Sequence, residues 1–425
     1  MQPSSPNKSS SAWSLSYRWP PHFELAFFGL TLLVTFLISF KLLLTYVAIV
    51  PLLLLYIIRN CAHHTSFNSI LTSFKKTKSD EISWMLFFIA VVATESIFGF
   101  SPARSFSKLS SLCITTTLIF ISRDFSRTYS SSLLVKTLIA GQVITALYSS
   151  SSKALVGYTP EIFLGDVTHS GQLAIVIPLF LGYFSKSIVR SNGLLIATFI
   201  GITLLSFACF AQSVPIFLVA TFGLYCHPRI RNVANISILT TCLCTNLKRG
   251  PWLGVGSVVL YLLFRWRPKL TLPSLFLIIA LAMSIPQIRN RILEGQRDFS
   301  IAGGRKIMWQ IGGELSMQYP MGIGYGNSRE LRSFSYEIPP QHRHFHNNLL
   351  NIAVETGWPG ILIFITWIGT ILRHVGSLEG FPLAILSNQI AGLVEYNFGD
   401  SEILMILFIC LGIYLGEREK PEDNG

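Results

Sequence analysis

Apolar blocks long enough to cross a bilayer, separated by short polar turns, make up most of this chain. A membrane-spanning helix needs about 20 mostly apolar residues. Because the 193–247 stretch could hold one hairpin fewer, twelve spans compete with the fourteen that the pattern favours. We therefore expect an all-α polytopic membrane protein with about 12–14 transmembrane helices. The predicted spans are 23–40, 42–58, 82–98, 107–121, 132–148, 172–189, 193–211, 213–227, 233–247, 251–265, 270–285, 349–372, 381–397 and 401–416.

One long polar stretch, residues 286–346, interrupts this pattern. It holds eight Lys/Arg and five Asp/Glu, together with aromatic residues and spaced glycines, which favour a folded subdomain. Loops longer than about 15 residues are usually functional or disordered. The predicted organisation is a tail at 1–22, membrane helices at 23–285, the loop subdomain at 286–346, membrane helices at 347–416 and a tail at 417–425.

The distribution of basic residues predicts the orientation of the chain. Short basic loops stay on the cytoplasmic side of a membrane. With fourteen spans the basic patches fall on one side together with both termini, and the 286–346 loop falls on the other. A basic cluster on that outer face suggests an anionic ligand there. The inner patches are Arg59 with Lys75, Lys76 and Lys78; Arg123 and Arg127; Arg190; Arg229 and Arg231; Arg265, Arg267 and Lys269; Arg373; and Arg418 with Lys420.

Composition agrees with a membrane protein, since 51% of the residues are hydrophobic and only 13% are charged. A soluble domain averages about 25% charged residues. The net charge of +12 lies largely in the connecting loops, so it does not argue for nucleic acid as a partner. Most of the seven cysteines lie inside apolar blocks and none lies in 286–346, which argues against a disulfide framework. Residues 1–22 lead into a first span that we expect to be retained.

Arg249 stands between two apolar blocks, next to Gly250 and Pro251. Proline suits the first turn of a helix, and glycine lets the backbone approach a ligand. A guanidinium at a helix start on the outer face could hold a phosphate through two hydrogen bonds. The alternative is an interfacial arginine that reaches lipid headgroups.

Arg305 lies in a predicted helix over 301–318, on the same face as Met308 and Leu315. A charge on a buried stripe needs a partner. That partner could be an anionic ligand, or a salt bridge to Glu314 or Glu337. The glycine-rich segment 319–327, after this helix, is expected to be a tight turn that packs the loop on the membrane helices rather than a dinucleotide site.

His342, His344 and His346 alternate, so on an extended segment they would share a face. Three histidines can bind zinc, but no acidic or thiol ligand is close in sequence, and we expect no metal site. The other interpretation separates His346 from its neighbours. It lies at the edge of a membrane helix, and imidazole suits a general base because it titrates near neutral pH.

Asn347, Asn351 and Glu355 follow His346 at helical spacing and form one polar stripe. They could line the same cleft, with Asn347 contacting substrate and Glu355 as the alternative general base. Asp166 and His169 precede another span on the outer face, where they could contact sugar hydroxyls or belong to a solvated loop.

No Asp-x-Asp pair of the kind that holds a divalent metal on a sugar nucleotide is found in the sequence. The nearest arrangement, Asp400 and Glu402, is expected to be a helix cap.

His346 and Asn347, nine further residues, and then Gly357 and Gly360 form a motif that resembles the signature of the bacterial O-antigen ligase and polymerase superfamily. Arg249 with Gly250, and Arg305 with the turn that follows its helix, also look like segments of that family. With the hydropathy pattern, the resemblance covers roughly residues 150–416.

The resemblance implies a metal-independent, inverting glycosyltransferase with an all-helical membrane fold of the GT-C type and no cofactor. Its donor would be a glycan on undecaprenyl diphosphate, and its site would face the periplasm in the bacterial inner membrane, among membrane lipids. Arg249 and Arg305 would hold the diphosphate, and His346 would activate the acceptor hydroxyl.

The expected activity is that of an O-antigen ligase, which transfers the glycan to a sugar acceptor at the periplasmic face, and lipid A–core is the acceptor that we expect. The near alternative is a polymerase that uses the same residues with a glycan acceptor, and protein O-glycosylation is a further variant. The alternative from another class is a transporter or flippase, which would place charged residues inside the spans and show internal repeats. Neither feature is evident in the sequence.

Overall fold

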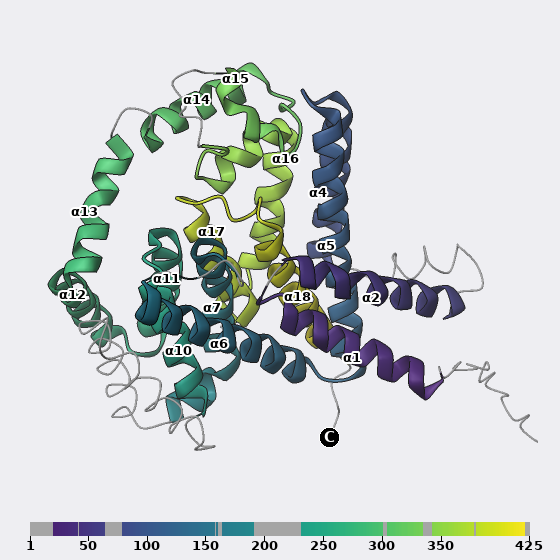
Figure 1. Cartoon of the computed structure of the whole chain (residues 1–425), viewed down its shortest axis with the longest axis horizontal. Helices are drawn as coiled ribbons and strands as arrows, with labels where there is room; N and C mark the ends of the chain where they lie inside the picture. Colours follow the sequence, from purple (N-terminus) through teal and green to yellow (C-terminus); the bar gives the residue numbers. More distant parts are fainter. Residues whose placement is uncertain are drawn as a thin grey trace, which may run out of the picture.

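A computed structural model describes residues 20–40, 42–63, 79–157, 159, 164–190, 231–300, 304–334, 342–377 and 380–420. Every regular element in these ranges is a helix (Figure 1), so the predicted all-α class is confirmed. The α-helices are α1 (Pro21–Leu37), α2 (Leu42–His63), α4 (Asp80–Phe98), α5 (Pro102–Thr128), α6 (Ser131–Val156), α7 (Asp166–Arg190), α10 (Arg231–Thr245), α11 (Arg249–Trp266), α12 (Pro268–Ser284), α13 (Pro286–Ser300), α14 (Arg305–Gln318), α15 (Leu331–Phe334), α16 (Asn348–Leu372), α17 (Gly380–Gly392) and α18 (Ser401–Arg418). Two short 3₁₀ helices are η1 (Asn327–Glu330) and η2 (Val375–Ser377).

Each predicted span that falls on described residues overlaps a helix. The spans predicted at 193–211 and 213–227 lie outside the described residues. By length and apolar composition, five described helices can cross a membrane on their own, or six if the bent pair α12–α13 forms one span. Others are shorter than the sequence pattern indicates: α17 has 13 residues, because it ends at Gly392 and not at 397.

Helix α18 forms the centre of the membrane part, since its residues from Ile403 to Gly416 are all buried. It packs closely against α5 through small residues. A Cβ atom on Gly412 would lie 2.3 Å from the Ile119 carbonyl oxygen, and one on Gly416 would lie 2.6 Å from that of Arg123. Such glycines let two helices approach closely in a membrane.

The turn at 320–326 fastens the polar loop to α16, as the glycine pattern predicts. Helix α16 is kinked at Gly357, which has φ 64°, and the turn docks into this kink. Ile323 N–H donates to the Val354 carbonyl at 2.9 Å, and Trp358 N–H donates to the Pro320 carbonyl at 2.8 Å. A Cβ atom on Gly357 would lie 2.4 Å from the Pro320 oxygen, so both its backbone conformation and this contact require glycine.

The loop has a small apolar core of its own, which supports the expectation that it is folded. This core joins α14 to the start of α16 and consists of Met308, Ile311, Leu315, Ile323, Leu331, Phe345 and Val354. Helix α13, by contrast, has no buried residue and is bent 96° from α12. Figure 1 shows α12 and α13 in sequence along one edge of the molecule, joining α11 to α14.

Candidate active site

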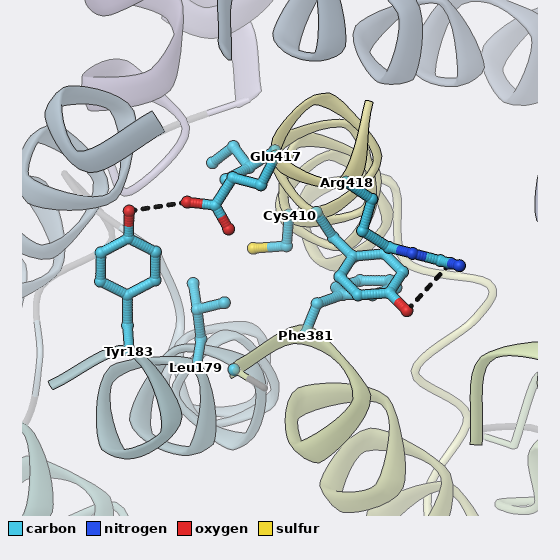
Figure 2. A pocket seen from close by; sticks show the side chains of 9 residues that line it. Leu179, Tyr183, Phe381, Cys410, Glu417 and Arg418 are labelled. Atoms are coloured by element: carbon cyan, nitrogen blue, oxygen red, sulfur yellow. Dashed lines mark hydrogen bonds between the residues drawn. The ribbon is translucent and has the colours of Figure 1, made fainter. Parts of the chain in front are cut away.

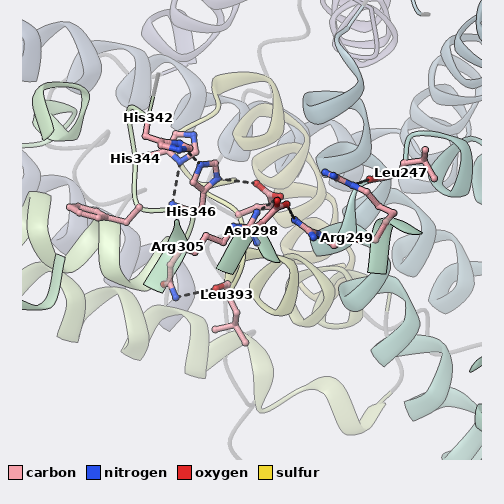
Figure 3. A network of polar contacts seen from close by, with 12 residues as sticks. Leu247, Arg249, Asp298, Arg305, His342, His344, His346 and Leu393 are labelled. Atoms are coloured by element: carbon pink, nitrogen blue, oxygen red, sulfur yellow. Dashed lines mark hydrogen bonds and ion pairs between the residues drawn. The ribbon is translucent and has the colours of Figure 1, made fainter. Parts of the chain in front are cut away.

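Four segments that are distant in sequence meet at one place (Figure 3). They are the start of α11 with Arg249, the start of α14 with Arg305, the segment 342–347, and the turn between α17 and α18. Figure 3 shows the three histidines close together, with Arg305 on one side of the cluster and Arg249 with Asp298 on another. The predicted association of Arg249, Arg305 and His346 is therefore present in the structure.

Arg249 is the first residue of α11, and its guanidinium lies against α13. Its Nη2 is 2.7 Å from Asp298 Oδ2, and its Nη1 donates to the Arg291 carbonyl at 3.4 Å. The side chain is only 14% exposed. A Cβ atom at Gly295 would lie 2.7 Å from Nη1, so this glycine makes room for the guanidinium. Arg249, at the start of α11, is thus held by the carboxylate of Asp298 in α13.

Arg305 begins α14 and pairs with Glu395, at 3.3 Å between Nη2 and Oε1. Burial and the positive charge of Arg249 lower the pKa of Arg305, while Glu395 opposes this effect. The counter-ion differs from those expected: Glu314 accepts a hydrogen bond from Gln310, and Glu337 lies outside the described residues. Two largely buried guanidinium groups thus lie close to one another, each beside a carboxylate.

His346 is the other partner of Glu395, with 3.5 Å between its Nδ1 and Oε2. Its Nε2 is 3.3 Å from His342 Nδ1, and its backbone N–H donates to His344 Nδ1 at 3.3 Å. Burial lowers the pKa of His344 to about 4, so its ring is neutral at neutral pH and can accept this bond. His346 adopts φ 50°, a left-handed conformation that is uncommon outside glycine.

Helix α14 fixes the histidine segment as well as Arg305. Trp309 Nε1 donates to the Phe345 carbonyl at 2.9 Å, and Phe345 is fully buried. A Cβ atom on Gly312 would lie 3.0 Å from the Phe345 ring, which shows how closely this helix packs on the segment. Helix α14 therefore positions both Arg305 and the segment that carries His346.

The polar stripe of Asn347, Asn351 and Glu355 lies along one face of α16, as its spacing predicts, but its partners are within the protein. Asn347 caps α16 by accepting from Leu350 N–H at 3.0 Å, and its Nδ2 donates to the Leu393 carbonyl at 3.1 Å. Asn351 accepts from the Phe345 N–H at 2.8 Å. These asparagines hold the two segments that carry His346 and Glu395.

Glu355 is fully buried and its two oxygens have protein partners. Its Oε1 accepts from Ser328 N–H at 3.3 Å and its Oε2 from the Tyr396 hydroxyl at 3.1 Å. This arrangement suits a carboxylate that ties the loop and the α17–α18 turn to α16. A catalytic role for Glu355 stays a prediction, and the geometry favours His346 over it.

Asp166 and His169 belong to a different network, between α6, α7 and α10. Asp166 pairs with Lys153 at 3.0 Å and accepts from the Thr159 hydroxyl at 2.9 Å. His169 is 1% exposed, with its Nδ1 3.7 Å from Cys242 Sγ. Because His169 is buried among protein groups, direct contact with sugar hydroxyls is not favoured in this conformation. Asp400 caps α18 by accepting from Glu402 N–H at 3.0 Å, as predicted.

Glu395 is the site residue that sequence reasoning missed. The sequence pattern predicts it inside the span 381–397, whereas α17 ends at Gly392 and Glu395 lies in the turn that follows. The signal was a single acidic residue in an apolar block, which is unusual in a membrane and tends to be functional. Asp298, the partner of Arg249, carried no such signal because it lies in a polar helix.

A separate cavity of about 250 Å³ lies at the other end of α17 (Figure 2). Gly380 at the start of α17 lines it, whereas Glu395 follows the end of that helix, and 13 helical residues rise about 20 Å. Tyr183 donates to Glu417 at 2.8 Å across this cavity. It is thus distinct from the Arg249–Arg305–His346 site. Its lining residues are Leu179, Tyr183, Gly380, Phe381, Cys410, Ile413, Tyr414, Glu417 and Arg418.

Residues 234–365 match the family model described as O-antigen ligase. The matched segment contains Arg249, Arg305 and His346, and it ends before Glu395. No curated protein matches the chain. The motif that begins at His346 lies within the matched segment, so this part of the chain is similar to the O-antigen ligase family.

Proposed function

We propose that the protein is an O-antigen ligase-type glycosyltransferase. It transfers a glycan from undecaprenyl diphosphate to a sugar hydroxyl, with lipid A–core as the acceptor. The observation that carries the proposal is that Arg305 and His346 share Glu395, while Arg249 lies close enough to Arg305 to affect its pKa. The family supports ligase- or polymerase-type activity, and the site residues provide the groups that such a transfer needs.

In the proposed reaction, His346 Nδ1–H faces Glu395 and Nε2 is the base. The acceptor hydroxyl replaces His342 as the hydrogen-bond donor to Nε2. As Nε2 takes the proton, the hydroxyl oxygen attacks the anomeric carbon opposite the diphosphate, which inverts that centre. The bond between the anomeric carbon and the phosphate oxygen breaks, and undecaprenyl diphosphate leaves with the electron pair.

Arg249 and Arg305 bind the diphosphate and stabilise the charge that it gains as it leaves. Fixed cations at a developing charge lower the barrier more than the same groups would in water. In this proposal the guanidinium groups take the place of a divalent cation. Wild-type transfer should therefore persist in EDTA, and activity that is lost on chelation and restored by Mg²⁺ or Zn²⁺ would contradict a metal-free mechanism.

A deletion strain distinguishes the ligase from the polymerase. We expect the core oligosaccharide to lose all O-chain on a lipopolysaccharide gel, while polymer accumulates on the carrier lipid. The matched control is complementation with the wild-type gene and with His346→Asn. Core that carries a single repeat would indicate a polymerase instead, and carrier lipid retained on the cytoplasmic side would indicate a transporter.

The site is proposed to face the periplasm, because the basic patches of the short loops all favour the other side. Alkaline phosphatase fused after Gly326, in the docking turn of the polar loop, should be active. The control is a fusion after Gly376, an exposed position between α16 and α17, which should be inactive. The reverse pattern of activity would overturn the orientation.

A further inference from the structure

Glu395 connects the two halves of the site. Its Oε1 lies 3.3 Å from Arg305 Nη2, on the proposed diphosphate side, and its Oε2 lies 3.5 Å from His346 Nδ1, on the acceptor side. Its side chain is 19% exposed. One carboxylate therefore has two partners whose proposed roles belong to different substrates.

The surrounding structure holds Glu395 in this place. Asn347 donates to the Leu393 carbonyl at 3.1 Å, which fixes the turn next to the histidine segment. A Cβ atom on Gly250 would lie 2.7 Å from Glu395 Cγ, so the start of α11 packs directly on the carboxylate stem. The ion-pair partners of the carboxylate itself are Arg305 and His346.

Burial by itself raises the pKa of Glu395, but His346 and Arg305 together bring it below its ordinary value. The group is thus an anion at neutral pH. In the structure each arginine already has a carboxylate partner, Asp298 on Arg249 and Glu395 on Arg305. A diphosphate that binds Arg305 must compete with Glu395, because two anions at one guanidinium repel each other.

We propose that Glu395 is a positioning residue that gives up Arg305 to the diphosphate of the donor and then closes its 3.5 Å contact with His346. Released from the guanidinium, the carboxylate holds Nδ1–H of His346 and orients Nε2 toward the acceptor hydroxyl. The base is then held most firmly when the donor is in place. This inference rests on the proposed function, since it assigns the arginines to the diphosphate and His346 to the acceptor.

The test compares donor binding with turnover in Glu395→Gln, in the purified full-length protein. Binding is measured with undecaprenyl diphosphate in nanodiscs, and turnover with the glycan-loaded donor at saturation. Without the competing anion, undecaprenyl diphosphate should bind about two- to fivefold more tightly. Because His346 loses the carboxylate that orients it, kcat should fall about 10–100-fold. A purely structural role would not move the two quantities in opposite directions.

Asp298→Asn is the matched comparison, because Asp298 pairs with Arg249 and with no histidine in the described part of the chain. Asp298→Asn should also bind undecaprenyl diphosphate more tightly. Unlike Glu395→Gln, it should not show the accompanying fall in kcat. Glu294→Gln, which removes an exposed carboxylate paired with Arg291, controls for the loss of negative charge and should leave both quantities unchanged.

Two results in Glu395→Gln would overturn the inference: weaker donor binding together with lower kcat, or an unchanged kcat. In either case, glycan transfer by the wild-type protein would still support the proposed function. If wild-type protein neither binds the diphosphate nor transfers glycan, the proposed function fails and the inference fails with it. Should the glutamine variant not fold, Glu395→Asp replaces it. Its charge remains but its reach is shorter, so donor affinity should stay near that of wild type while kcat falls, and an undiminished kcat would contradict the inference.

Discussion

Substitution of His346 is expected to reduce glycan transfer by about 10²–10⁴-fold, the usual contribution of a general base. The diphosphate is already a good leaving group, so the main loss is proton removal from the acceptor hydroxyl. Because His346 has φ 50°, His346→Ala would also strain the backbone. His346→Asn is the better variant, since asparagine tolerates the left-handed conformation and removes the imidazole.

The controls are the two histidines that contact His346. His342→Ala and His344→Ala should retain most activity, because in the proposed mechanism neither ring takes the proton. Transfer is measured in vitro with purified variants at matched expression, together with thermal stability. If His346→Asn and His346→Ala are as fast as wild type while Glu355→Gln is inactive, the base is the glutamate and the assignment to His346 is wrong.

The association of Arg249, Arg305 and His346 could be predicted because each has a local marker in the sequence. Arg249 precedes a glycine and a proline at a helix start, Arg305 begins an amphipathic helix, and His346 precedes the edge of an apolar segment. These features depend on neighbouring residues alone. Combined with the family resemblance, they were sufficient to place the three side chains in one site.

The counter-ions could not be predicted in the same way. Glu395 is separated from Arg305 by 90 residues and from His346 by 49, so the pairing depends on how helices pack. The salt-bridge partners that the sequence suggests, Glu314 and Glu337, both lie nearer to Arg305 along the chain than Glu395 does. Local sequence shows that a buried arginine needs an anion, but it does not show which distant carboxylate the fold provides.

Glu355 shows a related limit of periodicity. The spacing of Asn347, Asn351 and Glu355 correctly placed them on one face of α16, but it did not tell whether that face meets substrate or protein. The docking of the glycine turn decides the matter, because it brings Ser328 N–H to the carboxylate, and the α17–α18 turn brings Tyr396. Every member of the stripe has a protein partner, and spacing alone does not reveal these partners.

The arginines should be sensitive to substitution even when the charge remains. Arg249 uses two nitrogens toward two acceptors, Asp298 and the Arg291 carbonyl, and a lysine ammonium does not reproduce this planar fork. Arg249→Lys should therefore impair transfer, and Arg305→Ala should lower kcat/KM by about 10²–10³-fold, as loss of a transition-state donor does.

Lys306→Ala is the matched control for Arg305, since it removes an exposed positive charge from the adjacent position of α14 and should leave transfer unchanged. Donor-dependent initial rates at equal expression measure the effects. If both arginine variants transfer glycan at the wild-type rate, the arginines do not bind the diphosphate. They would then contact lipid headgroups at the membrane interface.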